Sequence, residues 1–326
     1  MIDWSSPKPQ DGDWRTGRGV AIIMQKSGIP DIDQANCMIK LESDGTFIVH
    51  SGGADIGTGL DTVVTKLTAE VLHCAPEEVH VISGDTDHAL FDKGAYASSG
   101  TCFSGNAARK AAENLREKIL FHGAQMLGEP VADVQLIAPG VVRGKQGEVS
   151  YGEIAHKAET GTGFGTLVAT ASYITADFAF PYGANFAEVA VNTRTGEIRL
   201  DKFYALLDCG TPVNPELALG QIYGASMRAI GHSLSEEILY DAEGHPLTRD
   251  LRSYGAPKIG DIPRDFRAVL VPSDDKVGPF GAKSISEIGV NGAAPAIATA
   301  IHDACGVWLR EWHFTPEKIL TALEKV

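Results

Sequence analysis

The chain of 326 residues has few cysteines, and their arrangement excludes several classes of protein. The five thiols are odd in number, widely scattered and never spaced Cys-x-x-Cys; they are Cys37, Cys74, Cys102, Cys209 and Cys305. This pattern excludes a disulfide framework and offers no ligand set for zinc or an iron–sulfur cluster. It fits a reducing compartment, so we expect a cytoplasmic protein.

The chain is also short of basic charge and of long apolar runs. Its formal net charge is −14 at pH 7, which argues against nucleic acid or an anionic membrane as a partner, because phosphate binding requires a basic surface. No apolar run is long enough to span a bilayer, and residues 1–7 lack the features of a signal peptide. The length allows one large or two medium domains.

Hydrophobic periodicity predicts the elements of the first half. Residues 1–16 are polar and proline-rich and are expected to form an extended arm. Alternating apolar residues predict a hairpin over 38–49, and apolar residues at helical spacing predict a helix over 60–71. A short strand over 79–83 and a second helix over 107–120 are expected to follow.

The second half repeats this plan. A hairpin is expected over 186–207, then a glycine-containing loop, then a helix over 217–230. The repeated order predicts an α+β fold of two related lobes, each with a mixed sheet plus helices, over 17–160 and 161–326. The turn-forming stretch 150–166 is expected to link the lobes, and a helix is expected from Thr315 to the end of the chain.

One carboxylate stands out near the end of the chain. Glu287 is flanked by glycines and small residues in a run that is almost free of other charge. A lone acid in a poorly hydrated pocket has the properties of a general base at neutral pH. The alternative is a loop with one solvated glutamate before a buried helix.

Three further loops carry side chains or backbone groups suited to a ligand. Gly57-Thr58-Gly59 precedes a predicted helix, whose free N–H groups suit an anion, although such a loop can be a simple helix cap. Residues 97–101 supply hydroxyl and amide donors, or form an ordinary serine- and threonine-rich loop. Asp208 and Asn214 can accept and donate hydrogen bonds to a polar ligand, or can form a tight strand-to-helix connection with Asn214 as N-cap.

In order and spacing, these four segments resemble the C-terminal half of the molybdopterin-binding subunit of molybdenum hydroxylases, the xanthine dehydrogenase and aldehyde oxidase family. The resemblance runs from about Gly17 to Leu320. It implies that Glu287 is the catalytic base. It also implies a set of cofactor-binding residues: Gly57, Thr58, Gly59, Ala97, Ser98, Ser99, Gly100, Thr101, Asp208, Cys209, Asn214, Arg228, Lys283 and Ser284. Thr58 and Arg228 stand where the family commonly has glutamine.

The resemblance also implies cofactors and partners. The cofactor would be molybdopterin cytosine dinucleotide, whose dithiolene holds the molybdenum, so no metal ligand is expected on the chain itself. The [2Fe–2S] clusters, FAD and NAD(P) are expected on other subunits only, and no dinucleotide fingerprint is present here. The motifs of the family's first half are absent, which predicts a split subunit with a larger molybdopterin subunit, an iron–sulfur subunit and an FAD subunit as partners.

The substrate is the least constrained part of this interpretation. A small heteroaromatic ring is expected, with nicotinate and its conversion to 6-hydroxynicotinate as the first choice. An aldehyde, a purine or carbon monoxide are alternatives, because the residues that grip substrate should lie mainly on the partner. A non-catalytic scaffold half of such a complex is the remaining alternative.

Overall fold

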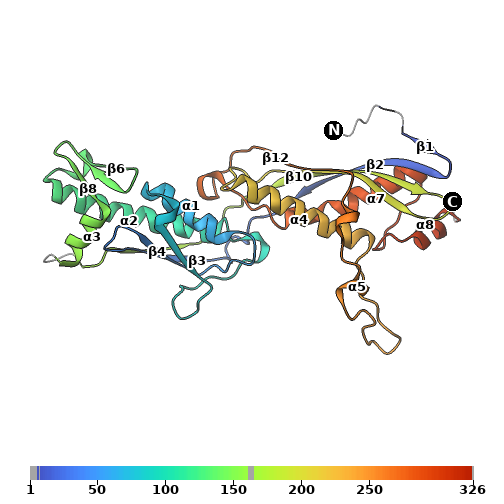
Figure 1. The fold of residues 1–326 in the computed structure, drawn as a ribbon, viewed down its shortest axis with the longest axis horizontal. Coiled ribbons are helices and arrows are strands. Elements are labelled where there is room, and N and C mark those ends of the chain that lie inside the picture. Colours follow the sequence, from blue (N-terminus) through green and yellow to red (C-terminus); the bar gives the residue numbers. More distant parts are fainter. Residues whose placement is uncertain (1–5, 7, 161–164, 325–326) are drawn as a thin grey trace.

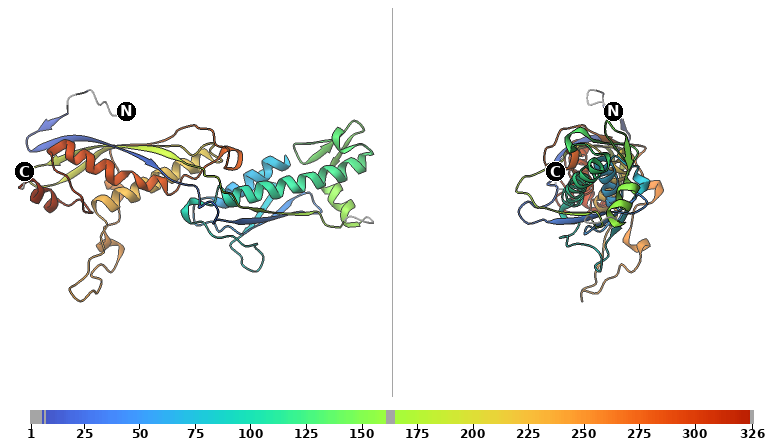
Figure 2. Two further views of the ribbon diagram at one scale, coloured as in Figure 1. Left: turned by 180° about the vertical axis from the view of Figure 1, so that it is seen from behind. Right: turned by 90° about the vertical axis from the view of Figure 1, so that its left-hand side faces the viewer.

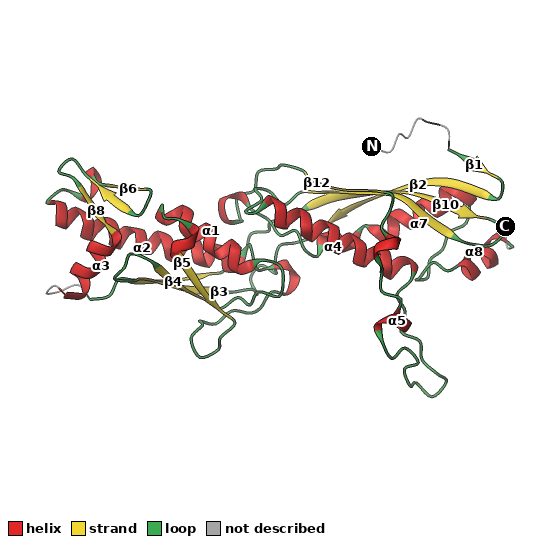
Figure 3. Cartoon of the chain, in the orientation of Figure 1, coloured by secondary structure: helices red, strands yellow, loops and turns green. Residues whose placement is uncertain are grey.

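The computed structural model describes residues 6, 8–160 and 165–324. Two α+β lobes lie end to end along the long axis of the molecule (Figure 1). Each lobe has a mixed sheet with its main helices packed on one face (Figure 3). The predicted fold class is confirmed. No helix within these residues has the length and apolar character that a bilayer crossing requires.

The first lobe is built on a four-stranded sheet of order β5-β4-β3-β9. The strands β3 and β4 form the predicted hairpin, β5 runs parallel to β4, and β9 is antiparallel to β3. The bounds of the strands are β3 Ala35–Leu41, β4 Phe47–Ser51, β5 Val79–Ser83 and β9 Val168–Tyr173. The predicted helices are α1, Leu60–Leu72, and α2, Phe103–Leu127, and α2 packs across β9 and β3.

The stretch predicted as the link between the lobes instead belongs to the first lobe. Residues 150–160 include helix α3, Tyr151–Thr160, which follows a small sheet at the far end of α2. The strands of that sheet are β6 Gln135–Ile137, β7 Val141–Arg143 and β8 Glu148–Ser150. Tyr151, Ile154 and Ala158 are buried at helical spacing, a signal outweighed in the prediction by the glycines that follow. Residues 161–164 lie outside the described part of the chain.

The second lobe has a five-stranded sheet of order β1-β2-β10-β11-β12. Its strands are β1 Gln10–Asp11, β2 Trp14–Met24, β10 Tyr182–Asn192, β11 Ile198–Leu207 and β12 Asp265–Leu270. Its helices are α4 Pro215–Leu234, α5 Leu251–Tyr254, α6 Ile288–Asn291, α7 Ala293–Cys305 and α8 Pro316–Leu323. Residues 235–262, which carry α5, form an arm that projects from this lobe (Figures 1 and 2).

The two lobes repeat one plan but exchange their fourth strands. In each lobe a hairpin, a helix, a strand parallel to the hairpin's second strand and another helix follow in order. The strand β2 precedes the first hairpin but pairs with β10 of the second, whereas β9 precedes the second hairpin but pairs with β3 of the first. The predicted lobe bounds 17–160 and 161–326 therefore need correction, because strand pairing follows matching faces and not proximity in the chain. Of the predicted extended arm 1–16, residues 10–11 and 14–16 belong to β1 and β2, and residues 1–5 and 7 lie outside the described part of the chain.

Strand exchange makes two segments cross between the lobes, residues 25–34 and 174–181. They are joined by backbone hydrogen bonds: the N–H of Gln25 donates to Pro181 O at 3.1 Å, and that of Ser27 to Ala179 O at 2.9 Å. The N–H of Asp31 donates to Thr175 O at 2.9 Å. The crossing point is therefore a pair of hydrogen-bonded segments and not a pair of free linkers.

Helix α7 lies unusually close to strand β2. A Cβ atom built on Gly17 would lie 2.0 Å from Ala300 O, and one built on Gly19 would lie 2.0 Å from Ala296 O. Only glycine on the strand, facing alanine on the helix, permits this approach. The contact holds β2 in the second lobe, and with it the segment that leads to the crossing point.

We expect Gly19→Val to destabilise the second lobe by about 3 kcal/mol, because the new side chain would force α7 away from the sheet. Urea unfolding followed by circular dichroism measures this change. Gly260→Ala is a matched control, since a Cβ there meets nothing within 4 Å. Equal stability of the two variants would contradict the proposed tight packing.

Candidate functional site

Two loops of the second lobe are joined side by side by backbone contacts. Gly210 forms an isolated bridge with Ala282, and the N–H of Lys283 donates to Cys209 O at 2.7 Å. Gly210 has a φ of +63°, and a Cβ there would lie 1.9 Å from Gly281 O, so this position requires glycine. The pairing brings the Glu287 loop, residues 278–287, beside the loop that leads into α4.

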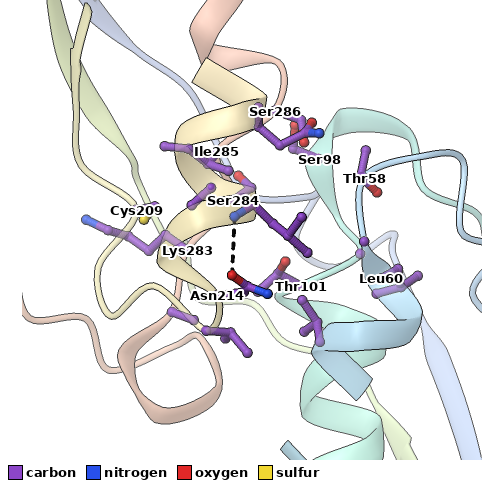
Figure 4. Close-up of a pocket in the computed structure, with 18 of the residues that line it drawn as sticks. Thr58, Leu60, Ser98, Thr101, Cys209, Asn214, Lys283, Ser284, Ile285 and Ser286 are labelled. Carbon is purple, nitrogen blue, oxygen red and sulfur yellow. Dashed lines mark hydrogen bonds between the residues drawn. The ribbon is translucent and has the colours of Figure 1, made fainter. Parts of the chain in front are cut away.

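These loops meet the first lobe around a cavity of about 530 Å³. The wall also includes the start of α1 and the loop of residues 95–101 (Figure 4). The structure brings together most of the predicted site residues: Thr58, Gly59, Ser98, Gly100, Thr101, Cys209, Asn214, Lys283, Ser284 and Glu287 all line the wall. The volume is in the range of small-molecule and cofactor pockets.

Five predicted residues do not line the cavity. Gly57, Ala97 and Ser99 are neighbours of wall residues, and the Ser99 hydroxyl donates to Gly94 O at 2.7 Å. Asp208 is buried behind the wall. Arg228 is exposed on α4, seven residues beyond the wall residue Gln221, which places it about 10 Å further along the helix.

Asp208 and Lys283 form a buried ion pair behind the wall. The Lys283 ammonium donates to Asp208 Oδ2 at 2.5 Å and to Phe180 O at 3.1 Å, so its charge points away from the cavity. Burial by itself would raise the pKa of Asp208, but hydrogen bonds from Lys283, Ser273 and the Gly210 N–H outweigh it and lower the pKa. Both side chains are thus occupied within the protein.

Glu287 lies at the edge of the cavity and is exposed. Its Oε2 accepts hydrogen bonds from Gln25 Nε2 and from Ser98 Oγ, each at 2.6 Å. The prediction that Glu287 lies in poorly hydrated surroundings is wrong, because no residue in the described part of the chain covers its side chain. Glu287 lies at the end of the loop, directly before α6, and this position places its carboxylate at the cavity.

The start of α1 already holds a carboxylate. Asp55 Oδ1 accepts from the N–H groups of Gly57 and Gly59 at 2.9 and 3.1 Å, and Oδ2 accepts from that of Asp61 at 3.3 Å. Burial would raise the pKa of Asp55, but these N–H groups lower it overall. Three of the N–H groups predicted to bind an anionic ligand are therefore engaged. The spacing of Asp55 two residues before Gly57 is the signal, typical of an Asx turn, that could have revealed this.

The donors that remain free on the wall are neutral. The hydroxyls of Thr58, Thr101 and Ser286 make no recorded hydrogen bond to the described residues. The Asn214 side chain caps α4 by accepting from the Leu217 N–H at 3.2 Å through Oδ1, which leaves its amide donors available (Figure 4). These hydroxyl and amide donors fit a ligand with many acceptor oxygens and nitrogens, such as a pterin with a phosphate tail. The predictions missed the wall residues Tyr96 and Gln221.

The cavity offers no metal-binding thiolate. Burial raises the pKa of the Cys209 thiol to about 11, so this wall residue is protonated at neutral pH. Within the described residues no cluster of three or more histidine, cysteine, aspartate or glutamate side chains is placed to hold a metal ion.

Comparison with known proteins shows a consistent set of relatives. Residues 1–263 match the family model of the molybdopterin cofactor-binding domain. The chain is 92% identical over 326 residues to the probable hypoxanthine oxidase XdhD of Escherichia coli strain K12, a match covering 100% of this chain and 34% of that protein. It is 32% identical to the gamma subunit of the 6-hydroxypseudooxynicotine dehydrogenase complex of Paenarthrobacter nicotinovorans, covering 94% of this chain and 39% of that subunit.

A solved structure shares the fold. The quinoline 2-oxidoreductase of Pseudomonas putida 86 superposes with a TM-score of 0.88 at 27% identity, covering 96% of this chain and 42% of that one. The two lobes and the cavity between them thus define a molybdopterin cofactor-binding protein. The chain belongs to the molybdenum hydroxylase family, that of xanthine dehydrogenases and aldehyde oxidoreductases, as the four loops predicted. It spans about a third of the length of its 92% identical relative.

We expect Lys283→Met to cost about 3–5 kcal/mol at pH 7, because it leaves the Asp208 carboxylate buried and unpaired. The lowered pKa of Asp208 means that its ionised form contributes stability above about pH 4, and that this contribution is lost as the pH falls through the folded-state value. The stability gap between variant and wild type should therefore narrow on acidification.

Urea unfolding at several pH values from 7 to 3 checks both expectations. The double variant Asp208→Asn with Lys283→Met removes both charges and should recover part of the lost stability. A single variant that loses less than about 1 kcal/mol at pH 7 would show that the pair is not important for folding.

Proposed function

We propose that this chain is the base-bearing part of the molybdopterin-binding subunit of a molybdenum hydroxylase that acts on a purine. The single observation that carries the proposal is the position of Glu287, a carboxylate held by two donors at the edge of a cofactor-sized cavity. A scaffold without catalytic function would have no use for an oriented carboxylate there.

The cofactor would be held by the neutral donors of the cavity wall. Thr58 and Thr101 on the first lobe and Asn214 and Ser286 on the second all line the cavity, so a bound molybdopterin would be held from both lobes. When bound, this group supplies the oxygen-transfer and redox chemistry of the family. The cytosine dinucleotide form is supported by the loop at residues 209–214, where Asn214 has amide donors free for a base or a ribose.

Glu287 would act as the general base of the reaction. Within the described part of the chain no group donates a hydrogen bond to Glu287 Oε1, so this atom is available to accept a proton. The other oxygen, Oε2, already accepts hydrogen bonds from Gln25 and Ser98. The exposure of the side chain in this chain would change on assembly, because a covering partner and bound cofactor would remove water from the carboxylate. Loss of water would favour proton uptake by the base.

This chain matches 34% of its 92% identical relative. The rest of such a protein would complete the cavity. An apolar strip on the uncovered face of the second lobe's sheet is a suitable contact surface: the alternate β2 residues Val20, Ile22 and Met24 are exposed, Ile22 to 85%. We propose that a larger molybdopterin-binding part docks there. Iron–sulfur and FAD subunits would accept the electrons, in a cytoplasmic complex.

A purine is favoured over nicotinate as substrate. The 92% identical relative is named a probable hypoxanthine oxidase. Nicotinate, which the likeness of the motifs to the medium molybdopterin subunit of nicotinate dehydrogenase favours, would require a cation for its carboxylate. The one basic side chain among the described wall residues, Lys283, is paired with Asp208. A neutral purine needs no such partner.

We expect Glu287→Gln to lower turnover by about 10²–10⁴-fold in the assembled enzyme, with folding and molybdenum content unchanged, because an amide cannot take the proton. Steady-state kinetics and elemental analysis measure the two properties. Glu311→Gln, at an exposed position outside the cavity, is the matched control. Activity of the Glu287 variant within a few-fold of wild type would refute the base assignment.

The substrate proposal predicts that the assembled enzyme has its highest kcat/KM with hypoxanthine or xanthine among a panel that also contains nicotinate and benzaldehyde. Ratios of kcat/KM measure the discrimination directly. A preference for nicotinate or benzaldehyde would overturn the purine assignment and leave the family assignment intact. Inactivity with all four, together with full molybdenum content, would favour the scaffold alternative.

A further inference from the structure

The Glu287 carboxylate is held unevenly by its neighbours. Both recorded donors, Gln25 Nε2 and Ser98 Oγ, bind the same oxygen, Oε2, at 2.6 Å. Gln25 Nε2 also donates to Ser98 Oγ at 3.1 Å, so the three side chains form a closed triangle. One carboxylate oxygen is therefore anchored, and no donor to the other is recorded within the described residues.

The two donors come from segments that the fold holds firmly. Gln25 begins the crossing segment, and its N–H donates to Pro181 O. Its side chain is steadied at the other end by Asn291 of α6, whose Nδ2 lies 3.5 Å from Gln25 Oε1. Each group in the triangle thus belongs to a different part of the chain, and the triangle exists only because the lobes meet here.

Ser98 lies on a backbone that is costly to form. Ala97 and Ser98 have φ values of +50° and +56°, a left-handed conformation that side chains other than glycine rarely adopt. The loop is fixed by the Gly28 N–H, which donates to Ala97 O at 2.7 Å from the crossing segment. Strain of this kind persists where surrounding contacts over-determine the backbone, and it commonly accompanies a functional position.

We propose that Gln25 and Ser98 are positioning residues that orient Glu287 through Oε2 and direct Oε1 toward the proton it accepts. This inference rests on the proposed role of Glu287 as general base. Both hydrogen bonds fall on Oε2, so the triangle holds the carboxylate in one orientation.

The charged groups near Glu287 do not replace these donors. Lys26 lies over the Phe178 ring, 4.3 Å from its centroid, and Lys283 is paired with Asp208. Within the described residues, none of the titratable groups on the elements around Glu287 forms an ion pair or hydrogen bond with its side chain. These groups are Tyr96 beside Ser98, Arg15 and Arg18 of β2, Arg199, Asp201, Lys202 and Tyr204 of β11, and Glu216, Tyr223, Arg228 and His232 of α4. Two neutral donors thus make all the recorded contacts with its carboxylate.

Two variants remove the donors one at a time. Ser98→Ala and Gln25→Leu should each move the protonation midpoint of Glu287 upward by about 0.5–1 pH unit, because the ionised form loses a hydrogen bond. The midpoint is measured by infrared spectroscopy of the full chain, with the Glu287 band identified by subtraction of the Glu287→Gln spectrum. Gln25→Glu keeps the side-chain size and should give a larger upward shift, because two carboxylates then share the site.

The assembled enzyme provides the second measurement. Both donor-removing variants should lower kcat by about 10–100-fold, the scale expected for a misplaced catalytic group, and change KM by less than about three-fold. The acidic limb of the pH profile of kcat/KM should move to higher pH. Ser43→Ala and Gln135→Leu, at exposed positions in the first lobe, are the matched controls and should change neither property.

The outcomes separate the two proposals. An unshifted infrared midpoint in the Ser98 and Gln25 variants overturns the positioning role, even if Glu287→Gln abolishes activity. Shifted midpoints in an enzyme whose turnover is insensitive to Glu287→Gln support the hydrogen-bonding triangle but overturn the base assignment. Lower activity with no change in midpoint or pH profile would indicate a merely structural effect and contradict the inference.

Discussion

The crossing of two chain segments between the lobes is the constraint on which the site depends. Residues 25–34 and 174–181 are joined by backbone hydrogen bonds because each lobe takes its fourth strand from the segment that precedes the other lobe's hairpin. Gln25 lies within this crossing, and Ser27 Oγ contacts Ser284 Oγ at 2.7 Å. Moving the lobes apart would therefore break these backbone hydrogen bonds, which hold the walls of the cavity in place.

The electrostatic design of the site follows from where charge is placed. The ammonium group of Lys283 is paired with Asp208 inside the protein, and Asp55 accepts hydrogen bonds from three N–H groups at the start of α1. What remains on the wall is a set of hydroxyl and amide donors with one carboxylate at the edge. Neutral donors bind the acceptor atoms of a pterin or a phosphate through directional hydrogen bonds and not through net charge. They also leave Glu287 without an ammonium partner, which would weaken a carboxylate as a base.

The sequence predictions were most accurate for elements whose structure depends mainly on their own residues. The helix α1 and both hairpins are confirmed, because their apolar spacing is periodic and turn formers bound them. The prediction of a linker at residues 150–166 was wrong for residues 151–160, which form α3. The glycines nearby outweighed the short apolar pattern of this helix in the prediction. The lobe bounds needed correction because no local feature of β2 or β9 indicates which sheet the strand joins.

The sequence by itself determined the family, the four loops and the carboxylate at Glu287, because these depend on residue types at fixed spacing along one chain. Tertiary structure alone decided which of these groups are free to bind. The contacts of Asp208 with Lys283 and of Glu287 with Gln25 and Ser98 join residues far apart in sequence, up to 262 positions. Hydrogen-bond partners depend on distances of a few ångströms in space, and those distances arise only when the exchanged strands bring the two lobes together.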